Sequence, residues 1–113
     1  MNTIVHPSPI KGQVEVPPSK SHTQRVLLAA ALSPGTSEII HPGLSEDESG
    51  MMEAVKSLGA KIRVASGHVF VEGGIEPVAT TLNMGESGLG IRLITPVAAM
   101  FQKEIRITGE GSL

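Results

Sequence analysis

The chain has 113 residues, with 9 Lys or Arg against 11 Asp or Glu, so its formal net charge is −2 when the four histidines are counted as neutral. Hydrophobic residues make up 40% of the chain and charged residues 18%, a balance that is too apolar for disorder and too interrupted by charge, Gly and Pro for a membrane span. From this balance we expect a globular protein that enters no membrane. Because there is no basic excess, we also expect that it binds no nucleic acid.

The chain contains no cysteine, which excludes disulfides, thiolate metal ligands and cysteine nucleophiles. Its first residues, Met1–Pro7, have neither a basic leader nor a long apolar run, so we expect no signal peptide and a cytoplasmic protein. The only aromatic residues of the Phe, Tyr and Trp type are Phe70 and Phe101. Ligand recognition is therefore expected to rely on polar groups rather than on ring stacking.

The first part of the chain predicts two strands and a helix. The strands are Thr3–His6 and Gln13–Val16, separated by proline and Lys-Gly breakers and closed by Pro17-Pro18. The helix follows from residue 19 and stops before Ser33-Pro34-Gly35. Its first two turns are polar and its remainder is apolar on every side, so we expect an exposed head and a buried tail.

The middle of the chain predicts a strand at Thr36–Ile40 and a second helix. Ser45-Glu46-Asp47-Glu48 has the Ser-x-x-Glu pattern of a capping box, in which each end side chain binds the other residue's free backbone N–H. Gly59 supplies the left-handed residue that commonly follows a helix. Four apolar residues between these signals fall on one helical face: Met51, Met52, Val55 and Leu58.

The remaining elements are a hairpin, a strand, a helix and a strand. Ala60–Ala65 and His68–Glu72 alternate in hydrophobicity around Ser66-Gly67 and predict the hairpin. Thr80–Met84 and Lys103–Thr108 predict strands that flank a helix at Leu89–Met100, which must kink or end early at its proline. Helices and strands thus alternate along the chain, which predicts an α/β (α+β layered) domain.

The head of the first helix is the strongest candidate site. Ser19, Lys20, Ser21 and Thr23 gather hydroxyls and a cation where free backbone N–H groups and the helix dipole favour an anion. Arg25 follows a little over one turn later and carries a fork of donors that suits a carboxylate or phosphate. The alternative is an ordinary capping serine followed by solvated Lys and Arg side chains.

The second candidate is the glycine-rich turn over residues 85–92, which opens the third helix and carries Arg92. Its glycines permit a ligand to approach backbone N–H groups closely. It has the spacing of neither a P-loop nor a dinucleotide-binding turn. The alternative is a simple strand-to-helix turn with Ser87 as the cap.

Other polar residues carry weaker signals. Asp47 lies in the first turn of the second helix between two glutamates, where acidic residues also suit the helix dipole without any catalytic role. The four histidines fall in different predicted elements without the spacing of metal ligands, and no carboxylate cluster accompanies them, so no metal site is expected.

Taken together, these motifs resemble the 5-enolpyruvylshikimate-3-phosphate synthases, the enolpyruvyl transferases of the shikimate pathway. The resemblance runs in order through several segments and covers most of the chain. The segments are Gly12-Gln13-Val14-Glu15-Val16-Pro17, Ser19-Lys20-Ser21-x-x-x-Arg25, Ser45-Glu46-Asp47-Glu48, Leu58-Gly59, Gly85-x-Ser87-Gly88-x-x-x-Arg92 and Gly109-Glu110.

The resemblance implies transfer of the enolpyruvyl group of phosphoenolpyruvate to the 5-hydroxyl of shikimate 3-phosphate, by addition and then elimination of phosphate, without metal or organic cofactor. Lys20 matches a lysine that touches both substrates, and Ser21 and Arg25 match residues that hold the shikimate phosphate and carboxylate. Gly88 matches a glycine whose backbone lies against phosphoenolpyruvate. Arg92 and Asp47 match supporting residues near the cleft.

Three positions depart from the family pattern: Pro18 stands for the usual Gly, Glu86 for the usual Asn and Leu89 for the usual Thr. Glu86 places a carboxylate where a phosphoenolpyruvate ligand is expected, and like charges near a bound anion disfavour binding. Weakened affinity or altered specificity follows, unless this carboxylate turns away or is protonated.

The resemblance also implies an organisation. Residues 1–18 correspond to crossover strands, and residues 19–113 to part of an N-terminal domain, with a first βαβαββ unit at about 19–75 and the start of a second at about 79–113. The second domain of the family, with its proton-transfer groups, is absent, so we expect no catalytic residue and no turnover in these 113 residues alone. A monomer is expected for the full-length family.

Two alternatives remain open at this point. A related transferase acts on a UDP-amino sugar, but it carries an Ala-Lys-Asn type of helix head where this sequence has Ser19-Lys20-Ser21. The chain could instead be an isolated anion-binding fragment without catalysis.

Overall fold

The computed structural model describes all of residues 1–113. Its first helix, α1 (Lys20–Leu32), begins after Ser19, whose Oγ accepts a hydrogen bond from the backbone N–H of His22 at 3.3 Å. The predicted bounds of this helix are confirmed. Its head, however, is not wholly exposed as predicted, because Thr23 and Gln24 are already buried.

A three-stranded antiparallel sheet in the order β1-β3-β2 covers one side of the helices. It consists of β1 (Thr36–Ile40), β2 (Lys61–Ala65) and β3 (His68–Glu72), which confirms the predicted strand and hairpin. Val69 and Val71 of the central strand are fully buried, since alternate residues of a strand face the same side.

The second helix, α2 (Glu46–Ser57), starts at the predicted capping box: the backbone N–H of Ser45 donates to Glu48 Oε2 at 2.7 Å. The four apolar residues predicted to share one face are all buried. The helix is followed by Gly59 in the left-handed region, with φ of +105°. Local capping signals therefore fixed both ends of this helix.

The last elements are β4 (Thr81–Asn83), α3 (Gly88–Ala98) and β5 (Arg106–Thr108). β4 and β5 form a two-stranded parallel sheet and are shorter than predicted. α3 contains Pro96 in its last turn and ends at Ala98, before the predicted Met100. Pro96 does not break the helix, because Ala99 N–H still bonds the carbonyl of Thr95; the helix ends where Met100 and Phe101 bond three residues back instead of four.

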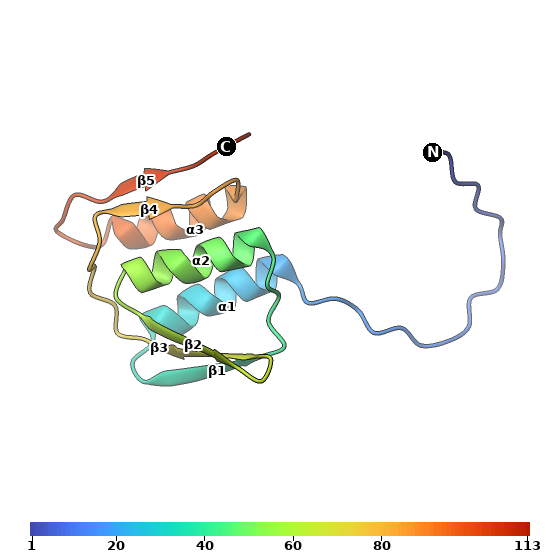
Figure 1. The fold of residues 1–113 in the computed structure, drawn as a ribbon, viewed down its shortest axis with the longest axis horizontal. Coiled ribbons are helices and arrows are strands. Elements are labelled where there is room, and N and C mark those ends of the chain that lie inside the picture. The colour runs from blue at the N-terminus through green and yellow to red at the C-terminus, as the bar shows by residue number, and fades with distance from the viewer.

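Figure 1 shows the three helices side by side between the two sheets, with their amino ends on the same side of the molecule. The hydrophobic core lies between the helices and sheets and is built from Leu, Ile, Val, Met and Ala side chains. The mixed helix and sheet architecture confirms the predicted α/β class. No helix is both long enough and apolar enough to cross a membrane.

The two strands predicted within residues 1–18 are not formed. These residues make no hydrogen bond to the rest of the chain and extend from α1 as an exposed arm (Figure 1). Val14 and Val16 are 84% and 74% exposed. The prediction of two strands here is wrong, because a strand needs a neighbouring strand to bond with and these residues have none in this structure.

Candidate functional site

The amino ends of all three helices lie on one side of the molecule (Figure 1), each after a serine: Ser19, Ser45 and Ser87. The first turns of α1 and α3 contain no acidic residue, whereas that of α2 contains three. Free N–H groups at a helix start attract anions. The starts of α1 and α3 therefore suit anionic groups of a ligand, while that of α2 is already compensated.

Lys20 and Asp47 join the starts of α1 and α2. Lys20 Nζ lies 2.7 Å from Asp47 Oδ2, and their side chains are 56% and 23% exposed. The hydrogen bond to Asp47, together with the Coulomb attraction of that carboxylate, raises the pKa of Lys20 above its ordinary value. Lys20 is thus a protonated cation at neutral pH, held in place at the open end of α1 and accessible to solvent.

Ser21 and Arg25 form a second pair on α1. Arg25 Nη1 donates a hydrogen bond to the backbone carbonyl of Ser21 at 3.1 Å, and both residues are exposed. Lys20 and Arg25 are five residues apart, which turns them about 140° from each other around a helix of 3.6 residues per turn. The two cations therefore leave α1 in different directions and border its amino end rather than converge on one point.

Gly88 and Arg92 form the third pair, in the first turns of α3. A methyl group at Gly88 would lie 3.9 Å from Arg92 Nη1, so the guanidinium lies over this glycine. Arg92 is exposed and makes no ion pair. Its charge is therefore available to an anion that approaches the glycine-rich turn.

A hollow of about 190 Å³ lies between the start of α2 and the glycine-rich turn. Four of its seven lining residues are carboxylates: Glu46, Asp47, Glu86 and Glu110. Glu86 is directed at the C-terminal segment, because a methyl group at Gly111 would overlap its carboxylate. Glu86 makes no ion pair, so this carboxylate adds uncompensated negative charge beside the turn.

Two buried polar residues of α1 lie beneath this site: Thr23, which the sequence placed among the hydroxyls of the helix head, and Gln24, which sequence reasoning missed. Thr23 Oγ1 accepts from the backbone N–H of Gly43, just before α2, at 3.3 Å. Gln24 Oε1 accepts from Ser87 Oγ, the cap of α3, at 3.0 Å. A signal was present, because Gln24 precedes Leu27 and Leu28 by three and four residues and so belongs to the buried face of α1.

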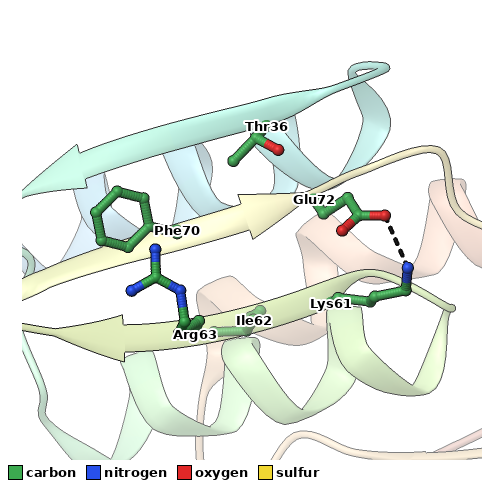
Figure 2. A pocket seen from close by; sticks show the side chains of 6 residues that line it. All are labelled: Thr36, Lys61, Ile62, Arg63, Phe70 and Glu72. Atoms are coloured by element: carbon green, nitrogen blue, oxygen red, sulfur yellow. Dashed lines mark hydrogen bonds and ion pairs between the residues drawn. The ribbon is translucent and has the colours of Figure 1, made fainter.

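A second hollow, of about 310 Å³, lies on the face of the three-stranded sheet opposite to the buried valines. Figure 2 shows that its cations are already engaged within the sheet. Lys61 Nζ pairs with Glu72 Oε1 at 2.7 Å, and the Arg63 guanidinium lies 4.1 Å from the centre of the Phe70 ring. With these partners in place, this hollow is a weaker candidate for an anion than the helix starts.

Of the four histidines predicted to fall in different elements, only His22 in α1 and His68 in β3 lie in one, because the strand expected at His6 does not form and His41 directly follows β1. The rings of His41 and His68 are 5.9 Å apart, edge to face, and His68 Nδ1 lies 2.7 Å from Glu38 Oε1. No group of three or more His, Cys, Asp or Glu residues is arranged to hold a metal ion.

Comparison with known proteins identifies the family of the chain. The family model of EPSP synthase (3-phosphoshikimate 1-carboxyvinyltransferase) matches residues 4–113. The 3-phosphoshikimate 1-carboxyvinyltransferase of Chlamydia abortus is 45% identical over 112 residues, which cover 96% of this chain and 25% of the relative. That of Methanocorpusculum labreanum is 38% identical over 117 residues, covering 100% of this chain and 28% of the relative.

A solved structure agrees with the sequence relatives. The EPSP synthase from Acinetobacter baumannii superposes with a TM-score of 0.74 at 27% identity, covering 90% of this chain and 24% of that protein. The chain spans about a quarter of the length of the curated relatives that it matches. On the family match and these likenesses, the chain belongs to the EPSP synthase family.

Proposed function

We propose that these 113 residues supply the shikimate-3-phosphate-binding part of a 3-phosphoshikimate 1-carboxyvinyltransferase. This enzyme moves the enolpyruvyl group of phosphoenolpyruvate to the 5-hydroxyl of shikimate 3-phosphate. Residues 19–75 and 79–113 act as two successive units of one substrate-binding domain, with residues 1–18 as its crossover segment. The family match and the relatives' names support this proposal.

The single observation that carries the proposal is the ion pair between Lys20 and Asp47 at the open start of α1. Asp47 holds Lys20 beside free helix N–H groups without burying it, so the ammonium group keeps donors for an incoming anion. Ser21 and Arg25 border the same helix start and provide a hydroxyl and a guanidinium fork. A sugar acid with one phosphate and one carboxylate matches these groups.

Phosphoenolpyruvate is assigned to the neighbouring helix start. Gly88 leaves the backbone of α3 open to close approach, and Arg92 lies over it with its charge uncompensated. The starts of α1 and α3 are joined by the hydrogen bond between Gln24 and Ser87. Two anionic substrates bound at these two helix starts would therefore lie beside each other, as a transfer between them requires.

A calorimetric titration of the 113-residue chain with shikimate 3-phosphate tests the proposal. Lys20→Ala and Arg25→Ala are each expected to weaken binding at least tenfold, in line with the loss of a charge-assisted contact. Lys61→Ala is the matched control, because it removes an equal charge from the outer face of the sheet. Equal affinity for inorganic phosphate would instead favour a general anion-binding fragment.

A further inference from the structure

We infer that Gln24 is a positioning residue that sets the start of α3, and with it the phosphoenolpyruvate side of the site, relative to α1. This inference rests on the proposed function for the identity of the substrates. Gln24 is fully buried and lies one turn after Lys20 on α1, so its side chain is not open to a ligand. Its role must therefore act through the residues it contacts.

The contact is a relay of two hydrogen bonds centred on one hydroxyl. Ser87 Oγ donates to Gln24 Oε1 at 3.0 Å and accepts from the backbone N–H of Gly90 at 3.0 Å. Ser87 is itself 1% exposed. A serine hydroxyl has one proton to give, and its use on Gln24 fixes the orientation in which its lone pair faces Gly90. Gln24 thereby defines the geometry of the helix cap.

The position of this relay gives it consequences for the site. Gly88 and Arg92 are the residues that present α3 to an anion, and Ser87 directly precedes Gly88. A methyl group at Gly90 would lie 2.8 Å from Ser87 Oγ and 2.7 Å from the terminal methyl carbon of Met84, so the turn fits closely around the serine. A change at Gln24 is therefore transmitted to the backbone that carries Gly88.

One atom of Gln24 shows that its presence is not explained by packing alone. The side-chain nitrogen Nε2 is buried without a hydrogen-bond partner, and an unpaired buried donor costs free energy that an apolar side chain would not cost. An isosteric methionine would avoid that cost while losing the bond to Ser87. Glutamine at this position therefore leaves the core one unpaired donor while supplying the bond that orients Ser87.

Thr23, the residue before Gln24 on α1, makes a comparable contact with the segment that precedes α2. It accepts from Gly43 N–H ahead of α2, and α2 carries Asp47. Consecutive residues of α1 therefore bind the starts of the two other helices, Thr23 on the Asp47 side and Gln24 on the Gly88 side. The two sides can be disturbed separately, which makes the inference testable.

The test compares Gln24→Met with the unmodified 113-residue chain by amide NMR, titrating shikimate 3-phosphate and phosphoenolpyruvate separately. Gln24→Met is expected to lower the affinity for phosphoenolpyruvate at least fivefold while the affinity for shikimate 3-phosphate changes less than twofold. Ser87→Ala should have the same selectivity. The double variant should be no weaker than Ser87→Ala alone, because both changes remove one shared bond.

Leu28→Ala is the control for general destabilisation. It removes a core side chain of the same helix that is 6% exposed and lies outside the relay. At a temperature where every variant is folded, it should leave both affinities within twofold. Equal losses for both substrates in Gln24→Met, or no loss for either, would overturn the inference. If the unmodified chain binds neither substrate, the proposed function itself fails, which is a distinguishable result.

Discussion

Lys20 and Asp47 lie in the first turns of two different helices, 27 positions apart in the chain, and their side chains meet with 2.7 Å between Nζ and Oδ2. This pair links the start of α1, which lacks acidic residues, to the start of α2, which has three. The excess negative charge of one helix start thus holds the cation of the other. The pKa of Lys20 therefore offers the most direct electrostatic test of the candidate site.

Replacing Asp47 by Asn should lower the pKa of Lys20 toward its ordinary value. Asp47 raises this pKa by hydrogen bonding and by Coulomb attraction, so removing its charge favours deprotonation of the lysine. An NMR titration of the Lys20 side chain measures the midpoint. Glu53→Gln is the control, because Glu53 pairs with Lys56 and not with Lys20. Identical midpoints in Asp47→Asn and the unmodified chain would contradict the assignment.

The same shift fixes the pH range in which the ion pair supports the fold. A lysine whose pKa is raised on folding contributes stability that is fully present below its unfolded pKa and is lost as the pH rises through the folded value. The pair is therefore expected to remain intact throughout the neutral range and to weaken only above the ordinary pKa of lysine. Comparing urea unfolding of Asp47→Asn and the unmodified chain across alkaline pH tests this, and their difference in stability should shrink at the highest pH.

Gly59→Ala should destabilise the protein more than Gly67→Ala. Both glycines have positive φ, +105° and +74°, so both substitutions strain the backbone by about 1 kcal/mol. A methyl group at Gly67 meets open space, whereas one at Gly59 would come within 2.3 Å of the backbone oxygen of Glu76. Urea unfolding should therefore show an additional loss of about 1–3 kcal/mol for Gly59→Ala. Equal losses would mean that the contact with Glu76 is not maintained.

The sequence predicted those features that depend on neighbouring residues. The start of α2 was found because Ser45 and Glu48 bind within one turn, and its end because Gly59 directly follows its last apolar residues. The strands predicted at Thr3–His6 and Gln13–Val16 are wrong, since pairing depends on a partner strand that no local pattern reveals. Local chemistry therefore indicated elements, and long-range pairing decided which of them formed.

The candidate site was predicted in its parts but not in its connections. Helix-start and guanidinium chemistry singled out Lys20 and Arg25, and Asp47 entered only through the family resemblance, but nothing in their spacing shows that Lys20 meets Asp47. The bond between Gln24 and Ser87 spans 63 positions. Such contacts are set by how the helices pack, and that packing follows from the apolar faces of several elements together.

Leu27→Ala should destabilise the fold by about 3 kcal/mol, in the usual range for a large core side chain reduced to alanine. Leu27 is 0% exposed in the middle of α1, so the substitution leaves a cavity between the helix and its neighbours. Leu32→Ala is the matched control on the same helix, because Leu32 is 42% exposed; its effect should stay below about 1 kcal/mol. Similar losses in urea unfolding for the two variants would contradict the assigned core.

Glu86→Gln should strengthen the binding of phosphoenolpyruvate. Glu86 lines the acidic hollow beside the glycine-rich turn and has no cationic partner, so its charge opposes an incoming anion. For an exposed charge the expected gain is roughly twofold to fivefold, and it should shrink in high salt. Glu104→Gln removes an equal charge outside this hollow and serves as the control. Equal gains in both variants would show only an effect of net charge.

The 113-residue chain should release no phosphate from a mixture of phosphoenolpyruvate and shikimate 3-phosphate. Enolpyruvyl transfer moves charge and protons between two anions, and donors stabilise such changes most strongly where water is excluded.

The candidate site is open: Lys20 is 56% exposed and already paired with Asp47, and four carboxylates line the adjoining hollow. These exposed groups do not form an enclosed set that could pass a proton. A phosphate-release assay measures this, with the 3-phosphoshikimate 1-carboxyvinyltransferase of Chlamydia abortus as the positive control. Phosphate release that Lys20→Ala abolishes would refute the prediction, whereas release that survives this substitution would identify a contaminating enzyme.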